Sequence, residues 1–405
     1  MAVQTQSKKP VTGQHQVGAL VVGGDHPGLA IVRSLGRRGI PVYVLDDKHC
    51  VSVYSRYATR VVRVRDLRDP QRTVDAVLET GLRYGLQDWV LFPTRDETVM
   101  AFSLYRDQLA EFYRVTTPDW ESIQHVWDKT NTYRLAEKLG IPAPKTWSVQ
   151  SKDELPFFYS KLPLAIKPAV KENFFYATGA KAWRVETREQ LHERFDAAAQ
   201  NIKLSEIMIQ EIIPGDGDRQ LSYCVFFREG RAHSSLTAKR LRQHPREFGR
   251  AASYVETADV PEIEELSQRF LQAINFYGIA EVEFKQDSRD GQYKLLDVNA
   301  RAWGFHGLGQ AVGVDFPYLM YADQLGYDVE PCRGRAGVGW LRLLTDTPVA
   351  LMEMMRGHLT IGSYVQSIRR AKTESVFSWG DPLPSIAEFA LLPYFLRNKL
   401  MNKKL

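Results

Sequence analysis

Three polar residues with different chemistry stand on alternate positions within residues 293–305. They are Asp297, Asn299 and Arg301. The apolar residues around them predict a strand, and side chains two positions apart on a strand leave from the same face. One face of this strand therefore carries a carboxylate, an amide and a guanidinium. Polar groups placed against a core cost free energy unless they are satisfied, so we expect a partner opposite this face.

An acid-bearing strand precedes this one, and together they predict a hairpin. Its turn signals centre on Asp290. A symmetric register then places Glu283 opposite Asp297, and the same register places Glu281 opposite Asn299. Cross-strand partners have Cβ atoms roughly 5 Å apart. Two carboxylates at that separation repel, and one pKa rises, unless a cation lies between them.

The acids and the amide of this hairpin form a hard, oxygen-only ligand set. Mg²⁺ bound through a few carboxylates, with phosphate and water completing its octahedron, fits such a set. Arg301 on the same face supplies a fork for a phosphate or carboxylate oxygen. The alternative interpretation is an exposed sheet face with ordinary ion pairs.

Strand and helix patterns alternate over the first part of the chain. Residues 18–24 and 40–47 predict buried strands, a helix between them stops at Gly39, and a further strand ends within residues 89–97. Such alternation predicts a parallel, doubly wound sheet up to about residue 117. Hairpins dominate after a helix that stops at Gly140. We therefore expect an α/β domain followed by α+β lobes.

Length and composition restrict the class of protein. The 405 residues are 44% apolar and 25% charged, and the formal net charge is +5. This charge favours anionic substrates and is too diffuse to predict a nucleic-acid partner. Three widely spaced cysteines suit a reducing compartment, so we expect a cytoplasmic protein without disulfides. No apolar run reaches the roughly 18 residues of a transmembrane segment, although the basic, aromatic C-terminus suits weak contact with a membrane surface.

From about Trp120 to Leu325 the sequence resembles the ATP-grasp superfamily, and in particular its group of predicted bacterial carboxylate–amine ligases. The likeness rests on the hairpin of residues 278–319, in which Asp297, Asn299 and Arg301 follow an acid-bearing strand. The resemblance implies a Rossmann-like N-terminal domain, a central subdomain with a phosphate lid, and a C-terminal lobe for nucleotide and metal. The expected units are a disordered tail (1–16), the Rossmann-like domain (17–118), the central subdomain (119–206), the C-terminal lobe (207–331) and an extension (332–405).

The resemblance also implies roles for the residues of the hairpin. Glu283 and Asp297 bind Mg²⁺, with Mn²⁺ as the alternative ion, and Asn299 completes the metal site. Arg301 stabilises the transferred phosphate or an acyl phosphate. Position 297 is Asp where the family usually has Glu, so the resemblance does not fix the number of metal ions.

Two lysines are expected to bind the phosphates of ATP. Lys129 precedes a helix and matches a basic residue that contacts ATP phosphates in the family. Lys167 ends an apolar strand in phase with Ala165, where a lysine needs an anion or a path to water. It matches the lysine that reaches the α- and β-phosphates.

The stretch that follows residue 206 is expected to bind the nucleoside. By the resemblance, the backbone of Glu211 and Ile213 meets the adenine edge, and Gln210 lies near its amino group. Asp218 is the expected acid for the ribose hydroxyls, with Asp216 as its substitute.

Two further stretches are predicted to contact phosphate or substrate. In the basic run of residues 238–250, Lys239 and Arg242 are the expected contacts for the γ-phosphate or an acidic substrate. The lid segment, residues 171–183, has a single glycine and three aromatic residues instead of a Gly-rich loop. We expect a stiffer lid that contributes side chains such as Lys171 or Thr178.

The expected function is that of an ATP-dependent carboxylate–amine ligase, which forms an amide through an acyl phosphate and releases ADP and phosphate. Its substrates are a small-molecule or peptide carboxylate and an amine, and Thr94 and Asp96 are expected to contact the amine. The sequence is compatible with a homodimer. A bicarbonate-activating or carbamoyl-phosphate-type enzyme of the same fold is the alternative.

An NAD(P)-dependent oxidoreductase is the lower-ranked alternative. Residues 21–30 read as a strand, a turn and a helix, and Asp46 and Asp47 end the next strand where a ribose-binding acid would stand. The dinucleotide fingerprint, however, requires a glycine where this chain has Asp25.

Overall fold

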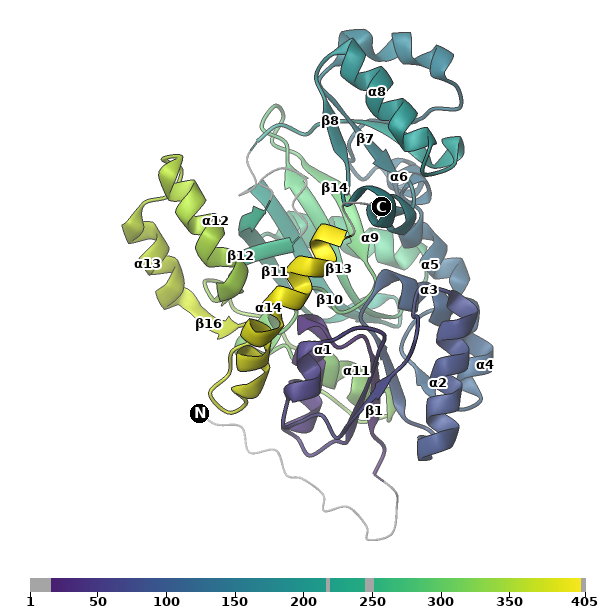
Figure 1. Cartoon of the computed structure of the whole chain (residues 1–405), viewed down its shortest axis with the longest axis vertical. Helices are drawn as coiled ribbons and strands as arrows, with labels where there is room; N and C mark the ends of the chain where they lie inside the picture. Colours follow the sequence, from purple (N-terminus) through teal and green to yellow (C-terminus); the bar gives the residue numbers. More distant parts are fainter. Residues whose placement is uncertain (1–15, 216–218, 245–250, 402–405) are drawn as a thin grey trace.

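The computed structural model describes residues 16–215, 219–244 and 251–401, and its strands form three sheets. Along the long axis of the molecule, the seven-stranded sheet lies in the middle (Figure 1). The N-terminal domain lies at one end and the four-stranded sheet lies at the other. The mixed α/β architecture confirms the predicted fold class.

The N-terminal domain is built on a parallel sheet. Its strands are β1 (Ala19–Val22), β2 (Val42–Asp46), β3 (Arg60–Arg63), β4 (Val90–Pro93) and β5 (Arg114–Val115), in the order β3-β2-β1-β4-β5. Its helices are α1 (His26–Gly36), η1 (Val51–Tyr54), α2 (Pro70–Tyr84), α3 (Asp96–Leu104) and α4 (Arg106–Ala110). Side chains of α1 pack on one face of the sheet, and those of α2 and α3 pack on the other. This is the doubly wound arrangement that the alternating pattern predicts.

The turn after β1 forms hydrogen bonds with neighbouring residues of the N-terminal domain. The Gly24 N–H donates a hydrogen bond of 2.5 Å to Asp46 Oδ2. Arg95 donates to Asp46 and Asp47 at 2.7 and 2.6 Å. The loop amide and the acids that would have to bind a dinucleotide are therefore engaged with each other. This geometry argues against the oxidoreductase interpretation.

A four-stranded antiparallel sheet forms the central subdomain. Its strands are β6 (Thr146–Ser148), β7 (Leu164–Pro168), β8 (Trp183–Val185) and β9 (Ile207–Glu211), in the order β6-β9-β7-β8. Its helices are α5 (Trp120–Trp127), α6 (Lys129–Lys138), η2 (Lys152–Lys161), α7 (Lys171–Thr178), α8 (Arg188–Ala199) and η3 (Leu204–Glu206). Because β9 pairs with both β6 and β7, the predicted boundary between residues 206 and 207 would cut this sheet, and the structure places it after β9.

The lid segment contains a helix, α7, where the family has a Gly-rich loop. Helix α7 ends at Gly179, whose φ of 66° is the left-handed conformation common at helix C-termini. Phe174 is buried and packs edge-on against Trp183, with ring centroids 4.7 Å apart. Aromatic packing therefore fixes this segment on its own subdomain.

A seven-stranded sheet forms the largest unit. Its strands are β10 (Gln220–Arg228), β11 (Arg231–His244), β12 (Ala251–Ala258), β13 (Gly278–Gln286), β14 (Tyr293–Asn299), β15 (Gly339–Leu341) and β16 (Ala371–Glu374), in the order β14-β13-β10-β11-β12-β15-β16. Its helices are α9 (Pro261–Ala273), α10 (Leu308–Ala311), α11 (Phe316–Gln324), α12 (Leu343–Met355), α13 (Ile361–Arg370) and α14 (Leu383–Met401). The predicted extension supplies β15 and β16, so it is part of this unit.

The two faces of the seven-stranded sheet have different partners. Tyr223 and its neighbours pack against α9 on one face. On the other face, Phe226 shares a core with Trp303 and with α1 of the N-terminal domain. Further along this second face, Glu283 and Asp297 line a cavity next to the four-stranded sheet. One face therefore both fixes the N-terminal domain and carries the polar residues of the hairpin.

The C-terminal extension is held on α1 by a buried ion pair. Arg33 Nε lies 2.9 Å from Asp381 Oδ2, and both side chains are almost inaccessible to solvent. Arg33 also donates to the Val376 carbonyl at 2.7 Å. The Ser55 hydroxyl donates to Asp381 at 2.7 Å. This network fixes residues 376–381 against the N-terminal domain.

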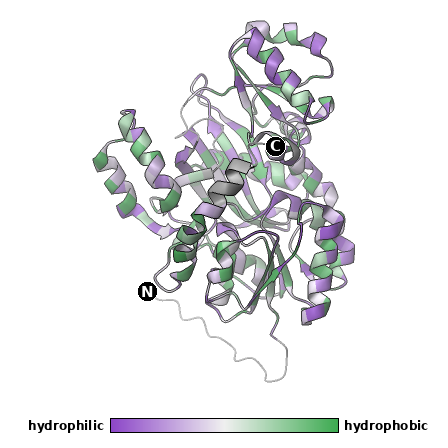
Figure 2. Cartoon of the chain, in the orientation of Figure 1, coloured by the Kyte–Doolittle hydropathy of each residue, from purple (hydrophilic) through white to green (hydrophobic). Residues whose placement is uncertain are grey.

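Helices α12 and α13 form a hairpin on which hydrophobic and hydrophilic residues alternate (Figure 2). Met355 and Ile361, near its turn, are 82% and 73% exposed. Within the described part of the chain, no helix is both long enough and apolar enough to cross a membrane.

Candidate functional site

A cavity of about 360 Å³ lies between the four-stranded and seven-stranded sheets. Its volume is in the range of small-molecule sites. The predicted site residues that line it are Lys129, Lys167, Gln210, Glu211, Ile213, Glu283 and Asp297. The fold thus brings together residues as far apart in sequence as Lys129 and Asp297, which are separated by 168 positions.

The acidic hairpin has the predicted register. Glu283 pairs with Asp297, and Glu281 pairs with Asn299, across β13 and β14. A register shift follows directly after Glu283. The polar residues of both strands therefore share the face that is turned toward the cavity.

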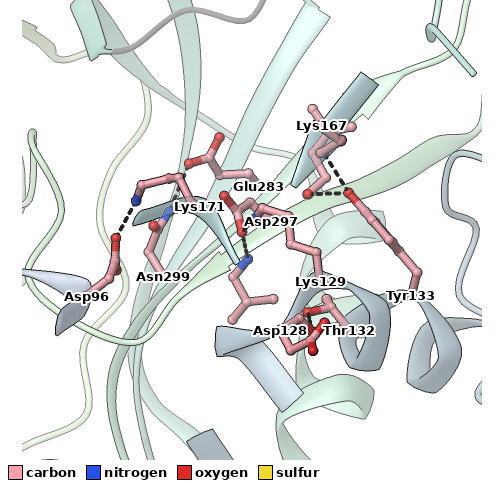
Figure 3. Close-up of polar contacts among 12 residues, drawn as sticks. Asp96, Asp128, Lys129, Thr132, Tyr133, Lys167, Lys171, Glu283, Asp297 and Asn299 are labelled. Atoms are coloured by element: carbon pink, nitrogen blue, oxygen red, sulfur yellow. Dashed lines mark hydrogen bonds and ion pairs between the residues drawn. The ribbon is translucent and has the colours of Figure 1, made fainter. Parts of the chain in front are cut away.

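A lysine lies against the acid of β14. Lys129 is the first residue of α6, and its Nζ contacts Asp297 Oδ1 (Figure 3). Burial raises the pKa of Asp297, but the neighbouring Lys129 outweighs burial and lowers that pKa below its ordinary value. The pairing revises the expectation of two repelling carboxylates, because Asp297 already has a cationic partner in the protein.

The two glutamates of β13, Glu281 and Glu283, both contact Asn299 and Arg240. Glu283 accepts hydrogen bonds from Gln220 and Asn299 at 2.7 and 2.9 Å. Arg240 lies 3.2 Å from Glu283 and 3.5 Å from Glu281. Burial, together with the charge of Glu283, raises the pKa of Glu281 to about 7. The guanidinium of Arg240 and the amide of Asn299 thus contact both acids and hold them side by side.

The donor set at this place fits Mg²⁺. Glu283 and Asp297 both line the cavity, and Asn299 lies between Glu281 and Glu283. Among the described residues, no three His, Cys, Asp or Glu side chains converge into a cluster that could hold a metal ion. Two carboxylates suffice for an ion that takes its other ligands from phosphate and water.

Lys167 has only neutral hydrogen-bond partners among the described residues. Its Nζ lies 3.1 Å from the hydroxyl of Tyr133, which Figure 3 shows beside it. The same Nζ lies 3.2 Å from Gln210 Oε1. A half-buried cation without a carboxylate partner favours an anionic ligand. This environment agrees with the phosphate-binding role that the sequence predicts for it.

Among the described residues that line the cavity, basic ones outnumber acidic ones. The basic side chains are Lys129, Lys167, Lys171, Lys181, Arg240 and Lys285, and the acidic ones are Glu211, Glu283 and Asp297. Burial, with a contribution from the charge of Lys171, lowers the pKa of Lys181 to about 8. The surplus of basic side chains in this lining makes the cavity suited to a polyanion.

Arg301 lies beside the cavity and is held by the N-terminal domain. Its Nε and a terminal nitrogen donate to the two oxygens of Asp96 at 2.6 and 3.0 Å. The same terminal nitrogen lies 3.2 Å from Asn299 Oδ1. Lys171, at the start of α7, contacts Asp96 as well (Figure 3). One carboxylate therefore joins the hairpin, the lid helix and the N-terminal domain.

The contacts of Asp96 differ from the predicted contact with an amine. Burial raises the pKa of Asp96, but Arg301 and Lys171 outweigh burial and hold that pKa well below its ordinary range. The Thr94 hydroxyl donates to the Val22 carbonyl at 3.0 Å. Both side chains are thus engaged within the protein, and Asp96 positions Arg301.

The two basic residues predicted from residues 238–250 lie outside the cavity. Lys239 pairs with Leu221, so it is on the sheet face opposite to that of Arg240. Arg242 forms a buried, two-pronged ion pair with Asp346 of α12, with both distances 2.8 Å. These placements correct the prediction, because Arg240 is the basic residue of this strand that reaches the acids of β13.

The structure describes only some of the residues that are predicted to bind the nucleoside. Strand β9 ends at Glu211, and the backbone of residues 212–215 continues along the cavity. Gln210 is buried and donates to the Thr146 hydroxyl at 2.7 Å. Asp218 and its substitute Asp216 lie outside the described residues.

The basic run of residues 238–250 was predicted from the sequence, but the contact of Arg240 with Glu281 and Glu283 was not. The signal that identifies it is the pairing of Arg240 with Gln220, which also contacts Glu283. That pairing follows from the alignment of β10 with β11. If that alignment shifted by one residue, Lys239 would face the cavity in place of Arg240.

Comparison with solved structures shows that the chain has the ATP-grasp fold. The N5-carboxyaminoimidazole synthetase of Staphylococcus aureus, solved with ADP, superimposes with a TM-score of 0.64 at 17% identity, covering 84% of this chain and 86% of that one. The biotin carboxylase domain of the Hydrogenobacter thermophilus 2-oxoglutarate carboxylase, solved with MgADP and bicarbonate, gives 0.63 at 14% identity, covering 80% and 74%.

In sequence, the chain is similar to the D-aspartate ligase of Enterococcus faecium (strain Aus0004). The two are 26% identical over 226 residues, which are 53% of each chain. The chain thus matches about half the length of this curated relative. No family model matches the sequence.

We predict that Lys167→Ala weakens ATP binding about tenfold or more, since a charge-assisted contact contributes roughly 1.5–3 kcal/mol. Calorimetric titration of the full chain with ATP measures the dissociation constant. Lys161→Ala is the matched control, because Lys161 lies in the same subdomain and donates to the Phe157 carbonyl at the surface. An unchanged ATP affinity in a folded Lys167→Ala protein would remove Lys167 from the nucleotide site.

Proposed function

We propose that this chain is an ATP-dependent carboxylate–amine ligase, which forms an amide or peptide bond and releases ADP and phosphate. The observation that carries the proposal is that the described lining of one cavity combines a surplus of basic side chains with the acids Glu283 and Asp297. The similarity to a D-aspartate ligase over half of its length supports the same reaction class.

The first step in this proposal is phosphoryl transfer to the carboxylate substrate. A carboxylate oxygen attacks the γ-phosphorus, the bond between that phosphorus and the β,γ-bridging oxygen breaks, and ADP leaves. Lys129 and Lys167 hold the phosphates of the nucleotide, and Gln210 with the backbone of residues 211–213 holds the adenine. The contribution of these groups is positioning and charge neutralisation.

The second step is attack of the amine nitrogen on the acyl phosphate. The carbon–oxygen bond to phosphate breaks, phosphate leaves, and the nitrogen loses a proton to solvent. Arg301 is placed to stabilise the negative charge of the acyl phosphate, because it lies next to Asn299 at the edge of the metal site. Asp96 fixes the orientation of its guanidinium.

Glu283, Asp297 and Asn299 are the residues that would hold Mg²⁺, and the same oxygen ligands also suit Mn²⁺. The ion would neutralise negative charge that moves between the phosphate oxygens. Lys129 contributes positive charge at the same carboxylate, since its Nζ contacts Asp297 Oδ1.

The reaction is tested by measuring ADP release with a panel of carboxylates and amines, with and without hydroxylamine. Hydroxylamine converts an acyl phosphate into a hydroxamate, so we expect a carboxylate-dependent hydroxamate with one ADP per product. ADP release that depends on bicarbonate alone would support the carboxylase alternative. Absence of ADP release with every substrate in the panel would contradict the ligase.

We predict that Asp297→Asn lowers turnover at least a hundredfold, because a full ligand charge is lost from the metal site. The same change should lower the metal-free stability by about 1–3 kcal/mol, since Lys129 loses its carboxylate partner. Denaturant unfolding in EDTA and steady-state ADP release measure the two effects.

Asp75→Asn, on the exposed surface of α2, is the control for these measurements. Loss of stability with unchanged ADP release would mean that Asp297 is only the structural partner of Lys129.

A further inference from the structure

A small cavity, which we call the edge cavity, adjoins the candidate site at β14, the edge strand of the seven-stranded sheet. Its volume of about 30 Å³ is room for about two water molecules or for the amino end of a substrate. Lys129, Lys171 and Asp297 line both the edge cavity and the larger cavity. A group in the edge cavity therefore lies next to the proposed metal site.

The edge cavity also adjoins Arg301. Asp96 and Asn299 belong to its wall. Asp96 accepts hydrogen bonds from the guanidinium of Arg301 at 2.6 and 3.0 Å, and Asn299 Oδ1 lies 3.2 Å from the same guanidinium. Arg301 stabilises the acyl phosphate in the proposed reaction. The edge cavity is thus bounded by two residues that contact the group beside the reacting carbonyl.

With one exception, the remaining described residues of this wall are apolar. They come from α3, α5 and the end of β14, and they are Val99, Ile123, Val126, Trp127, Val298 and Ala300. The exception is Glu172. An apolar wall limits access of bulk water, so it disfavours the charged form of a carboxyl group.

Glu172 brings a buried carboxylate into this wall. It is the second residue of the lid helix α7 and is only 8% exposed. Its Oε1 lies 3.4 Å from Nζ of Lys171, and that Nζ also contacts Asp96. A cation that is shared and this distant compensates the carboxylate only in part for its loss of water.

The other acids in the described wall of the edge cavity have closer partners. Asp96 accepts two hydrogen bonds from Arg301, and Asp297 contacts Lys129 and belongs to the proposed metal site. Glu172 is therefore the acid of this wall that is best placed to take up a proton.

The electrostatic surroundings of Glu172 support this role. The charged groups that face it from α3, α6, α7 and β14 are Asp96, Glu97, Lys129, Lys171 and Asp297. Burial raises the pKa of Glu172 to about 7, the charges of Asp96 and Glu97 add to this rise, and Lys171 opposes it. A carboxyl group with such a pKa is matched to proton transfer at neutral pH.

We propose that Glu172 is the general base that deprotonates the amine substrate in the second step of the proposed reaction. The inference rests on the proposed ligase function and adds a catalytic residue to it. An aliphatic amine is protonated at neutral pH and cannot attack a carbonyl carbon in that form. Its nitrogen has to lose a proton beside the acyl phosphate, where the edge cavity lies.

The step balances as follows. The ammonium group gives one proton to Glu172, and the lone pair of the nitrogen then forms the bond to the acyl carbon. The bond between that carbon and the phosphate oxygen breaks, and phosphate leaves with its electron pair. The nitrogen loses its second proton to solvent, phosphate takes up one proton at neutral pH, and Glu172 returns its proton to solvent.

The test compares two nucleophiles in the full chain and in Glu172→Gln, with ATP and Mg²⁺. The first is the aliphatic amine that gives the highest rate of ADP release in the panel, together with its carboxylate. The second is hydroxylamine, which is neutral at pH 7 and needs no base. We expect Glu172→Gln to lower amide formation about a hundredfold and to leave hydroxamate formation nearly unchanged.

Glu193→Gln is the matched control, because it is the same substitution at an exposed position of α8 in the same subdomain. It should form amide and hydroxamate like the unaltered chain. Glu172→Gln should be at least as stable as the unaltered chain in thermal unfolding at neutral pH. The substitution removes a carboxylate whose charged form is disfavoured by burial.

The pH dependence of amide formation gives a second readout. In the unaltered chain, the rate should rise with pH as Glu172 loses its proton, around pH 7, and then level off. In Glu172→Gln, the rate should continue to rise until the amine itself loses its proton in solution.

Equal loss of amide and hydroxamate formation in Glu172→Gln would overturn the inference, because Glu172 would then act before the amine does. Undiminished amide formation, or the same pH profile in both proteins, would overturn it as well. Absence of hydroxamate from the unaltered chain with every carboxylate of the panel would contradict the proposed function and the inference with it. Hydroxamate formation combined with an unaffected amide rate in the variant would contradict the inference alone.

Discussion

The contact between Lys129 and Asp297 joins the two walls of the cavity. It connects the start of α6 to β14 across 168 positions of sequence, and the lysine is almost buried there. Charges so far from water require partners in the protein or in a ligand. The other polar residues of the cavity are arranged around this pair, with Glu283 beside Asp297 on the neighbouring strand and Lys167 on the opposite sheet.

A second chain of contacts holds the units of the protein together at the edge of the cavity. Asn299 contacts Arg301, Arg301 is bound by Asp96, and Asp96 also contacts Lys171 of the lid helix. The lid adds a contact between the Tyr176 hydroxyl and Glu97 of the N-terminal domain. The lid position is thus coupled to the residue that the proposed reaction uses for the acyl phosphate, which a Gly-rich loop closing by its backbone alone would not provide.

The sequence was sufficient for the features that depend on local pattern. A turn at Asp290 with alternating side chains on both flanks determines that Glu283 faces Asp297, since the side-chain period of a strand is two. The position of Lys167 at the end of an apolar strand likewise predicts the half-buried lysine that the structure shows beside Tyr133. The parallel sheet of the first domain follows from its strand–helix alternation.

Features that depend on a bulge within a hairpin, such as the register shift between Phe226 and Phe227, or on distant pairing could not be read from the sequence. The choice between Lys239 and Arg240 depends on how β10 aligns with β11, and a register shift after Arg240 turns Arg242 toward Asp346. The pairing of Arg301 with Asp96 spans 205 positions and has no local signature. The subdomain boundary was misplaced because β9 closes a sheet with strands that precede it by about forty residues or more.

We expect this cavity to bind a nucleoside triphosphate together with a divalent ion held by the acidic hairpin. Titration of the full chain with ATP, in Mg²⁺ and in EDTA, and with Glu283→Gln in parallel, tests it most directly. We predict that Mg²⁺ increases ATP affinity at least tenfold and that Glu283→Gln abolishes the increase. ATP affinity that is independent of Mg²⁺ in the unaltered chain, or an unchanged Mg²⁺ effect in Glu283→Gln, would contradict it.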